Sequence, residues 1–277
     1  MMPPARLAVY AASTGVAATA FWAVAVRPPP LGLAVGMLAG YVSLIVGAVF
    51  VLRWRVFVDA VVRGPPGARG VVLTFDDGPH PRWTPRVLRI LEEHHAPATF
   101  FVVGRKAEEN PVLVREIMAR GHAVGLHSYA HDRLFSLRSE RRVRDDIERG
   151  VSVLERVCGV RPVFFRPPIG HTNPAVARVI DEFGLTVVGW SATGRDGVAS
   201  AKPNAVLARI RRNLRDGTIV LLHDSPEWGD REPAGIRALP AVLDAIGAAG
   251  LSVVPLAHWV DPARADRAQD EGAGSTT

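Results

Sequence analysis

The sequence predicts an α/β fold, a distorted (β/α)7 barrel, preceded by an N-terminal transmembrane helical hairpin. From residue 71 onward, short apolar runs rich in β-branched residues alternate with amphipathic stretches, which is typical of a parallel sheet covered by helices. Two long apolar stretches without a charge precede this pattern. The polar residues able to carry chemistry follow the ends of the apolar runs, which is where barrel enzymes build their sites.

The first 56 residues differ in composition from the rest and are expected to form a membrane anchor. The stretches at about 7–26 and 31–52 each reach the length of about 20 residues that a helix needs to cross a bilayer core. The alternative for the first stretch is a cleaved signal peptide, for which Ala23-Val24-Ala25 offers a cleavage site. The second stretch would remain after such a cut, so an anchor is expected either way.

Arginines flank the two stretches unevenly, and they predict an orientation. They are Arg6 before the first stretch, Arg27 in the connector, and Arg53, Arg55, Arg63 and Arg69 after the second. By the positive-inside rule, both ends of the hairpin face the cytoplasm. We therefore expect a multi-pass protein of the cell membrane whose catalytic domain, residues 64–262, is cytoplasmic. Residues 263–277 are small and polar, and we expect them to be disordered.

Seven strands are expected, at residues 71–75, 98–103, 123–126, 162–165, 185–190, 218–222 and 251–254. Six helices alternate with them, at about 84–95, 111–120, 139–157, 174–183, 203–214 and 234–249. Prolines near the predicted helix starts and glycines just after the predicted ends agree with these boundaries. Strand and helix alternate throughout, which predicts a parallel sheet.

Two adjacent carboxylates, Asp76 and Asp77, close the first strand in the run VVLTFDDGPH. On an extended backbone their side chains point to opposite faces, so one can be aimed at a cation. An ordinary solvated turn is the competing interpretation, because Asp-Gly is a common turn dipeptide. Downstream, His127 and His131 follow another short strand, and imidazoles four residues apart can share one metal ion. Together with Asp77 they would leave an open position on zinc for water or substrate.

Four groups of residues occur in the order and spacing of one known family, which the region from about 70 to 256 resembles. They are Thr74-Phe75-Asp76-Asp77-Gly78, His127-Ser128-Tyr129-Ala130-His131, Arg166-Pro167-Pro168-Ile169-Gly170 and Leu221-Leu222-His223-Asp224. The family is the polysaccharide deacetylases with NodB homology, carbohydrate esterase family 4. The resemblance implies the incomplete barrel of that family and a metal-dependent amidase.

The resemblance also implies a role for each matching residue. Asp76 would be the catalytic base positioned by Arg166, His223 the catalytic acid tuned by Asp196, and Asp77, His127 and His131 the metal ligands. The amide of Ile169 would complete an oxyanion hole, and Pro168, Trp190 and Leu222 would line the substrate side. The cofactor is expected to be Zn²⁺, with Co²⁺ or another divalent ion as alternatives.

Two positions depart from the family pattern. Ile169 stands where the family usually has an aromatic residue, and Gly197 stands where a tryptophan often follows the tuning aspartate. Both changes remove surface on which a sugar ring could stack. The polar stretch 170–174 next to the site can bind substrate, or Thr172 or Asn173 can cap the helix that Pro174 begins.

The predicted function is removal of an N-acyl group, acetyl first, from an amino sugar of a polysaccharide or glycan. The alternative substrate is a polyprenyl-phosphate-linked sugar, deacetylated or deformylated at the inner leaflet. An alternative of another class is a catalytically silent carbohydrate- or metal-binding membrane protein. The presence of Asp76, Arg166 and His223 disfavours it, since binding alone needs neither base nor acid.

The net charge of +6 comes from scattered arginines without a recognition motif, so nucleic acid is not an expected partner. The single cysteine, Cys158, excludes an internal disulfide.

Overall fold

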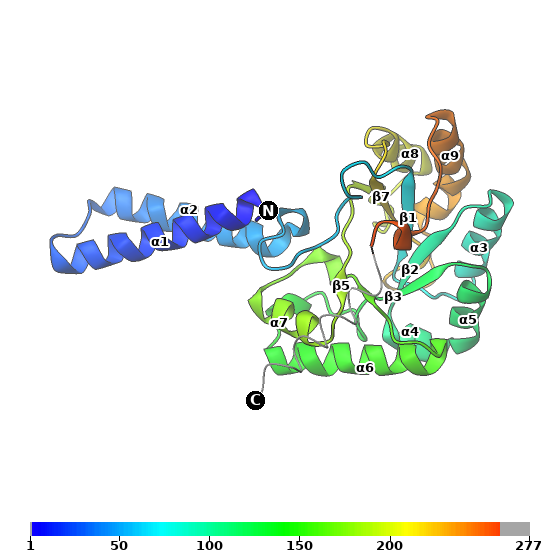
Figure 1. Cartoon of the computed structure of the whole chain (residues 1–277), viewed down its shortest axis with the longest axis horizontal. Helices are drawn as coiled ribbons and strands as arrows, with labels where there is room; N and C mark the ends of the chain where they lie inside the picture. The colour runs from blue at the N-terminus through cyan, green and yellow to red at the C-terminus, as the bar shows by residue number, and fades with distance from the viewer. Residues whose placement is uncertain (1, 261–277) are drawn as a thin grey trace.

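The computed structural model describes residues 2–260 as a helical hairpin joined to a curled α/β barrel (Figure 1). Residues 261 and 262, the last two of the predicted catalytic domain, lie outside the described residues. So does the predicted disordered tail at 263–277. In the hairpin, α1 (Pro4–Ala25) and α2 (Leu31–Phe50) lie side by side and project from the barrel. A bond between Ser13 Oγ and Tyr41 Oη, 3.0 Å, links the two helices.

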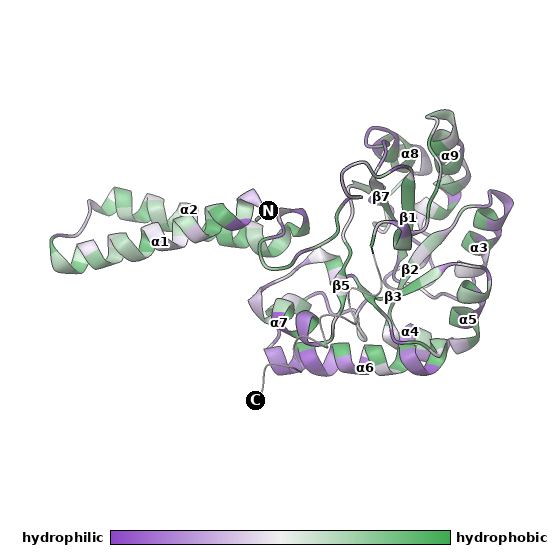
Figure 2. Cartoon of the chain, in the orientation of Figure 1, coloured by the Kyte–Doolittle hydropathy of each residue, from purple (hydrophilic) through white to green (hydrophobic). Residues whose placement is uncertain are grey.

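Both hairpin helices are apolar along their length, and most of their side chains are exposed (Figure 2). By length and composition each is able to cross a membrane, and a helix near the N-terminus that meets this description can equally belong to a signal sequence. The predicted positions of both apolar helices are confirmed to within a few residues.

The barrel wall is a single parallel sheet. Its strands are β1 (Val71–Asp76), β2 (Ala98–Val102), β3 (Ala123–Leu126), β4 (Phe164–Phe165), β5 (Thr186–Val187), β6 (Ala192–Thr193) and β7 (Thr218–His223), in the spatial order β5-β4-β3-β2-β1-β7-β6. β1 lies between β2 and β7, with Asp76 beside Phe101 on one side and His223 on the other. The carboxyl ends of the strands therefore meet at one edge, as the sequence predicted.

Helices cover the outside of the sheet. They are α3 (Thr84–Glu93), α4 (Gly104–Glu109), α5 (Pro111–Ala119), α6 (Glu140–Cys158), α7 (Pro174–Glu182), α8 (Pro203–Arg211) and α9 (Ala234–Ala248). Six match the predicted helices. The seventh, α4, was missed because its six residues are too few to show an amphipathic period. Asn173 caps α7 by accepting a hydrogen bond from the Val176 amide at 2.7 Å, which decides in favour of a capping role for this residue.

The predicted alternation fails at the barrel closure. Residues 251–254 form no strand and contribute only a bridge between Val253 and Val71, so the prediction of a strand there was wrong. The remaining strand is β6, which follows β5 after four residues with no helix between them. The chain passes directly from pairing with β4 to pairing with β7, and an extended segment around Val61 pairs with Val188 to fill the gap. No helix therefore separates β5 from β6, and α8 is the crossover between β6 and β7.

The hairpin is packed against the barrel at its base. Val49 in α2 accepts a hydrogen bond from the Thr172 amide at 3.1 Å, and Phe50 meets the His171 ring edge-on with centroids 4.4 Å apart. Leu52, in the short 3-10 helix η1 (Leu52–Trp54), is buried in the main core of the barrel. The end of α2 thus contacts the loop after β4 and holds it in place.

Candidate metal centre and active site

The acidic pair ends β1 with a sharp change of backbone direction. Asp76 is the last strand residue, whereas Asp77 has a φ of 72°, in the left-handed region. This turn brings both carboxylates to one imidazole, with Asp76 Oδ2 3.8 Å and Asp77 Oδ1 3.6 Å from His127 Nε2. The expectation that the two side chains point to opposite faces was therefore wrong. Gly78 follows because a side chain there would strike the buried carboxylate of Asp224.

The two histidines lie in the loop after β3. His127 Nδ1 is 2.7 Å from the Arg166 carbonyl, which can only accept a hydrogen bond, so Nδ1 carries the proton. Nε2 is then unprotonated, and its lone pair faces the acidic pair and can bind a metal ion. The loop is non-helical, since Ser128 and His131 have φ values of 59° and 53°. Asp146 of α6 holds the loop by accepting backbone N–H groups at 2.8 and 3.0 Å.

The three donor atoms fit a divalent metal ion. Asp77 Oδ1 lies 3.1 Å from His131 Nε2 and 3.6 Å from His127 Nε2, and all three ligand atoms lie within 4.8 Å of one another. Ligands placed tetrahedrally at about 2.0–2.2 Å from zinc stand about 3.3–3.6 Å apart. The spacing and the two-nitrogen, one-oxygen donor set therefore suit an ion of this kind with a position left open.

Burial and neighbouring charges set the protonation of the cluster. Burial lowers the pKa of His127 to about 4, against the opposing effect of Asp76, so its imidazole is neutral at physiological pH and its lone pair is available. Burial alone would raise the pKa of Asp77. The hydrogen bond with His131 and the charges of His223, His131 and His127 outweigh burial and hold that pKa below its usual range.

Arg166, directly after β4, is fully buried, and each of its three guanidinium nitrogens donates to an acceptor. Nη1 donates to Asp76 Oδ1 at 2.6 Å and to Thr74 Oγ1 at 2.8 Å. Nε donates to the Val188 carbonyl and Nη2 to the Gly189 carbonyl, both at 2.9 Å. Asp76 is thereby fixed with its second oxygen turned towards the metal ligands.

His223 ends β7 across from the acidic pair, and Asp196 holds it twice. One oxygen of Asp196 accepts the His223 amide at 2.9 Å, and the other lies 3.0 Å from His223 Nδ1. Burial opposes the charged imidazolium, but Asp196 outweighs it and raises the pKa of His223 to about 10, with help from Asp77 and Asp76. Gly235, near the start of α9, leaves the room for Asp196 that any side chain would fill.

The residues predicted to surround the substrate separate into two groups. Ile169 has a φ of 57°, is 44% exposed, and its amide makes no hydrogen bond within residues 2–260, so it is free to donate. Trp190 is partly buried and packs on Gly170 beside it. Pro168 is buried, and Leu222 lies wholly in the main core. The prediction that Leu222 lines the substrate was therefore wrong, because alternate residues of β7 face opposite sides and Leu222 faces the core.

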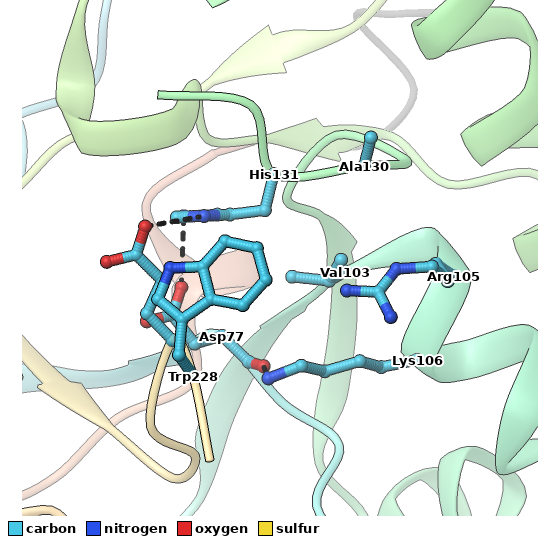
Figure 3. Close-up of a pocket in the computed structure, with 8 residues that line it drawn as sticks. Asp77, Val103, Arg105, Lys106, Ala130, His131 and Trp228 are labelled. Atoms are coloured by element: carbon cyan, nitrogen blue, oxygen red, sulfur yellow. Dashed lines mark hydrogen bonds and ion pairs between the residues drawn. The ribbon is translucent and has the colours of Figure 1, made fainter. Parts of the chain in front are cut away.

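Several neighbours of the cluster carried no recognisable signal in the sequence (Figure 3). A small pocket beside the metal ligands is lined by Asp77, Val103, Arg105, Lys106, Ala130, His131, Glu227 and Trp228. Lys106 donates to the Asp77 carbonyl at 2.7 Å and to Ser225 Oγ at 2.8 Å, tying the acidic turn to the loop after β7. Glu227 approaches His131 Nδ1 at 3.7 Å. These residues come from separate elements that only the tertiary fold brings together.

A parallel barrel whose strand ends gather a His2Asp cluster, a second carboxylate and a charged histidine has the parts of a metal-dependent hydrolase. The chain belongs to the polysaccharide deacetylase family, whose model matches residues 63–188. It is a hydrolase that acts on carbon–nitrogen bonds other than peptide bonds. The resemblance found in the sequence is thereby confirmed.

Named relatives and a solved structure support the same assignment. A chitooligosaccharide deacetylase of Azorhizobium caulinodans is 38% identical over 195 residues, which cover 67% of this chain and 92% of the relative. A peptidoglycan-N-acetylglucosamine deacetylase of Bacillus cereus is 34% identical over 197 residues, covering 70% and 89%. The solved structure of a peptidoglycan N-acetylglucosamine deacetylase matches with a TM-score of 0.66 and 30% identity, covering 72% of this chain and 91% of that one.

The two carboxylates of the acidic turn are predicted to respond differently to amidation. Asp76→Asn leaves all three ligands in place, so we expect full divalent metal content and a fall in kcat of about 100-fold or more, as loss of a positioned base causes. Asp77→Asn removes a charged ligand, so metal content should fall together with activity. Elemental analysis and hydrolysis rates on the same samples check both. Equal metal loss in the two variants would show that these roles are misassigned.

Asp196→Asn is predicted to make kcat fall at a lower pH on the alkaline side of its pH profile. The carboxylate raises the pKa of His223 from 6.5 to about 10, so its loss should lower that pKa and move the alkaline limb of the kcat profile to lower pH. The same pair contributes stability that is present below pH 6.5 and lost as pH rises through about 10. A kcat profile recorded from pH 5 to 11 measures the shift. Superimposable limbs in the two proteins would contradict the pairing.

Proposed function

We propose that the protein is a membrane-anchored, metal-dependent deacetylase of glycans that contain N-acetylglucosamine. The observation that carries the proposal is the convergence of three pairs or clusters at one edge of the sheet. The Asp77, His127 and His131 cluster stands beside the Asp76–Arg166 pair and faces the His223–Asp196 pair. The names of the chitooligosaccharide and peptidoglycan deacetylase relatives support the choice of sugar.

Asp76 is the group that takes the proton from the attacking water. Arg166 occupies Oδ1 at 2.6 Å, which leaves Oδ2 free on the side of the metal ligands. Asp77, His127 and His131 would hold a divalent ion, with Zn²⁺ proposed and Co²⁺ as an alternative, which would supply the Lewis acidity that polarises the carbonyl and acidifies water. Asp76 therefore presents its free oxygen to the attacking water as the proton acceptor.

His223 is the group that returns a proton to the departing amine. Breaking the carbon–nitrogen bond leaves an electron pair on nitrogen, and the imidazolium beside Asp196 holds the proton that this pair takes up. The Ile169 amide, which makes no hydrogen bond within residues 2–260, can donate to the carbonyl oxygen as negative charge develops there. The products are acetate and a free amino sugar.

The arrangement disfavours a silent binding protein. A binding site gains nothing from a second buried carboxylate with its own arginine, and burying that charged pair is costly unless it is fully hydrogen-bonded. Here both the Asp76 and the His223 sides are ordered by such partners. Retention of a base and an acid on opposite sides of one metal site supports catalysis.

A lipid-linked amino sugar is a second candidate substrate, and one observation favours it. The loop that carries Ile169 packs on the end of α2, through Thr172 on Val49 and His171 on Phe50. With α1 and α2 as a membrane anchor, this contact puts the site next to the membrane surface. A sugar carried on a polyprenyl phosphate, acetylated or formylated on nitrogen, would be presented at that level.

Trp228 provides an aromatic surface at the mouth of the site. Its side chain is 73% exposed and lies across the pocket from Arg105 and Lys106, close to His131 (Figure 3). Sugar rings stack on such surfaces, and this chain lacks the aromatic groups that the family carries at Ile169 and Gly197. We therefore assign Trp228 to substrate binding, as a replacement from the loop after β7.

A substrate panel tests the proposed reaction on the full chain in detergent or nanodiscs. We expect acetate release from N-acetylglucosamine oligomers or peptidoglycan fragments, with Asp76→Asn as the inactive control. Trp228→Ala should raise KM about three- to tenfold with little change in kcat, since an aromatic contact contributes about 0.5–1.5 kcal/mol. Trp228→Phe should retain most of the affinity. Release only from a lipid-linked sugar would favour the second candidate, and no release with Zn²⁺, Co²⁺ or Mn²⁺ would refute the proposal.

Orientation of the anchor is a separate prediction. Four arginines follow the second apolar stretch and one lies in the connector, so the catalytic domain is proposed to face the cytoplasm. A reporter that functions only outside the cytoplasm, fused after Pro262, should be silent, and a cytoplasmic reporter at the same place should be active. The reverse pattern would assign the domain to the outer side and favour wall polymers as substrate.

A further inference from the structure

A groove lined by arginines lies beside β6, the edge strand of the sheet, and the end of α8. Ser191, Thr193 and Arg195, in β6 and directly beside it, line one side of the groove. The residues on its walls are Arg53, Val62 and Arg63 from the segment after α2, Trp190, and Arg209, Arg212 and Asn213 from the end of α8.

The five groove arginines share a charge pattern that sets them apart. None of them pairs with a carboxylate among residues 2–260, and no acidic residue lines the groove. Many other surface arginines do have such a partner, for example Arg69 with Asp216 at 2.9 Å. Arg209 donates to the Gly194 carbonyl at 3.1 Å, which leaves its remaining N–H groups available. Burial and the charge of Arg215 lower the pKa of Arg63, as expected for cations gathered without a counter-charge.

The position of the groove indicates where its anion comes from. Arg53 lies three residues beyond Phe50, the last residue of α2. A helix of 20 residues measures about 30 Å, the thickness of a bilayer core, so its end reaches the level of the lipid headgroups. Trp190 lines the groove and also packs on Gly170, so the groove adjoins the loop that carries Ile169.

We propose that this arginine groove binds a phosphate group carried on a membrane lipid. Guanidinium groups match phosphate oxygens with paired hydrogen bonds and keep their charge at all physiological pH values. The proposal rests on the membrane anchor proposed above and is independent of the chemistry at the metal centre. Two lipids offer the same group at this depth, a phospholipid headgroup and the phosphate of a polyprenyl carrier. The bound phosphate would fix the rotation of the barrel on the membrane.

A matched pair of triple variants of the full chain in detergent tests the groove. The groove variant combines Arg53→Gln, Arg63→Gln and Arg212→Gln. The control combines Arg89→Gln, Arg115→Gln and Arg142→Gln, which lie exposed on α3, α5 and α6 and form no ion pair with a carboxylate among residues 2–260. Both lose the same charge. Binding of dihexanoyl phosphatidylglycerol, geranyl phosphate and inorganic phosphate is measured by thermophoresis.

We expect the groove variant to bind at least one of the two lipid phosphates tenfold or more weakly than the wild type, since each arginine contributes about fivefold near an anionic surface. The control should bind as the wild type does. Preference for geranyl phosphate would identify a polyprenyl carrier, and preference for phosphatidylglycerol a headgroup. Equal loss in both variants, or inorganic phosphate binding as tightly as either lipid, would overturn the proposal. Metal content and hydrolysis of a water-soluble oligosaccharide, measured on the same samples, separate this outcome from failure of the proposed function.

Discussion

The architecture of the site depends on the burial of one positive charge. Arg166 is 0% exposed, and a guanidinium is tolerated there because each of its three nitrogens donates a hydrogen bond and Asp76 balances its charge. Its partners are Thr74 and Asp76 on β1 and the carbonyls of Val188 and Gly189 after β5. One side chain of β4 therefore fixes three parts of the barrel relative to one another. Loss of any partner would leave a buried donor without an acceptor. Asp76 therefore cannot move independently of the segment after β5 that carries Val188 and Gly189.

The site also holds several residues in a backbone conformation that side chains disfavour. Asp77, Ser128, His131 and Ile169 all have φ between 53° and 72°. Such residues cost on the order of 1 kcal/mol or more each, and they persist where the surrounding structure determines them fully. Each lies one to five residues after a strand end. The strain turns two carboxylates towards one imidazole, brings two histidines onto one side, and frees the Ile169 amide. The strands thus hold the backbone in place, and the strained loops that follow them bring the side chains of the site together.

The sequence carried the local information and lacked the non-local part. Apolar alternation predicted the long strands and six helices, and the position of Asp76 and His223 at strand ends predicted that they would meet. β5 and β6 have two residues each, too few for a period, so the uninterrupted passage between them was not predictable. Trp228 and Glu227 join the site through a loop whose path depends on tertiary contacts. The apolar composition of α2 likewise gave no sign that its end packs on the loop after β4.

That last contact changes how the hairpin is to be understood. A flexible tether would hold the domain near a membrane without orienting it, whereas Val49 and Phe50 contact the residues that follow Ile169 directly. Leu52 then enters the barrel core, so no free linker separates the two parts. The axis of the hairpin and the direction of the Ile169 amide are thereby coupled through two residues. Arg53 lies where the chain leaves the hairpin and lines the arginine groove, so the same junction that holds the loop of Ile169 also brings positive charge beside β6.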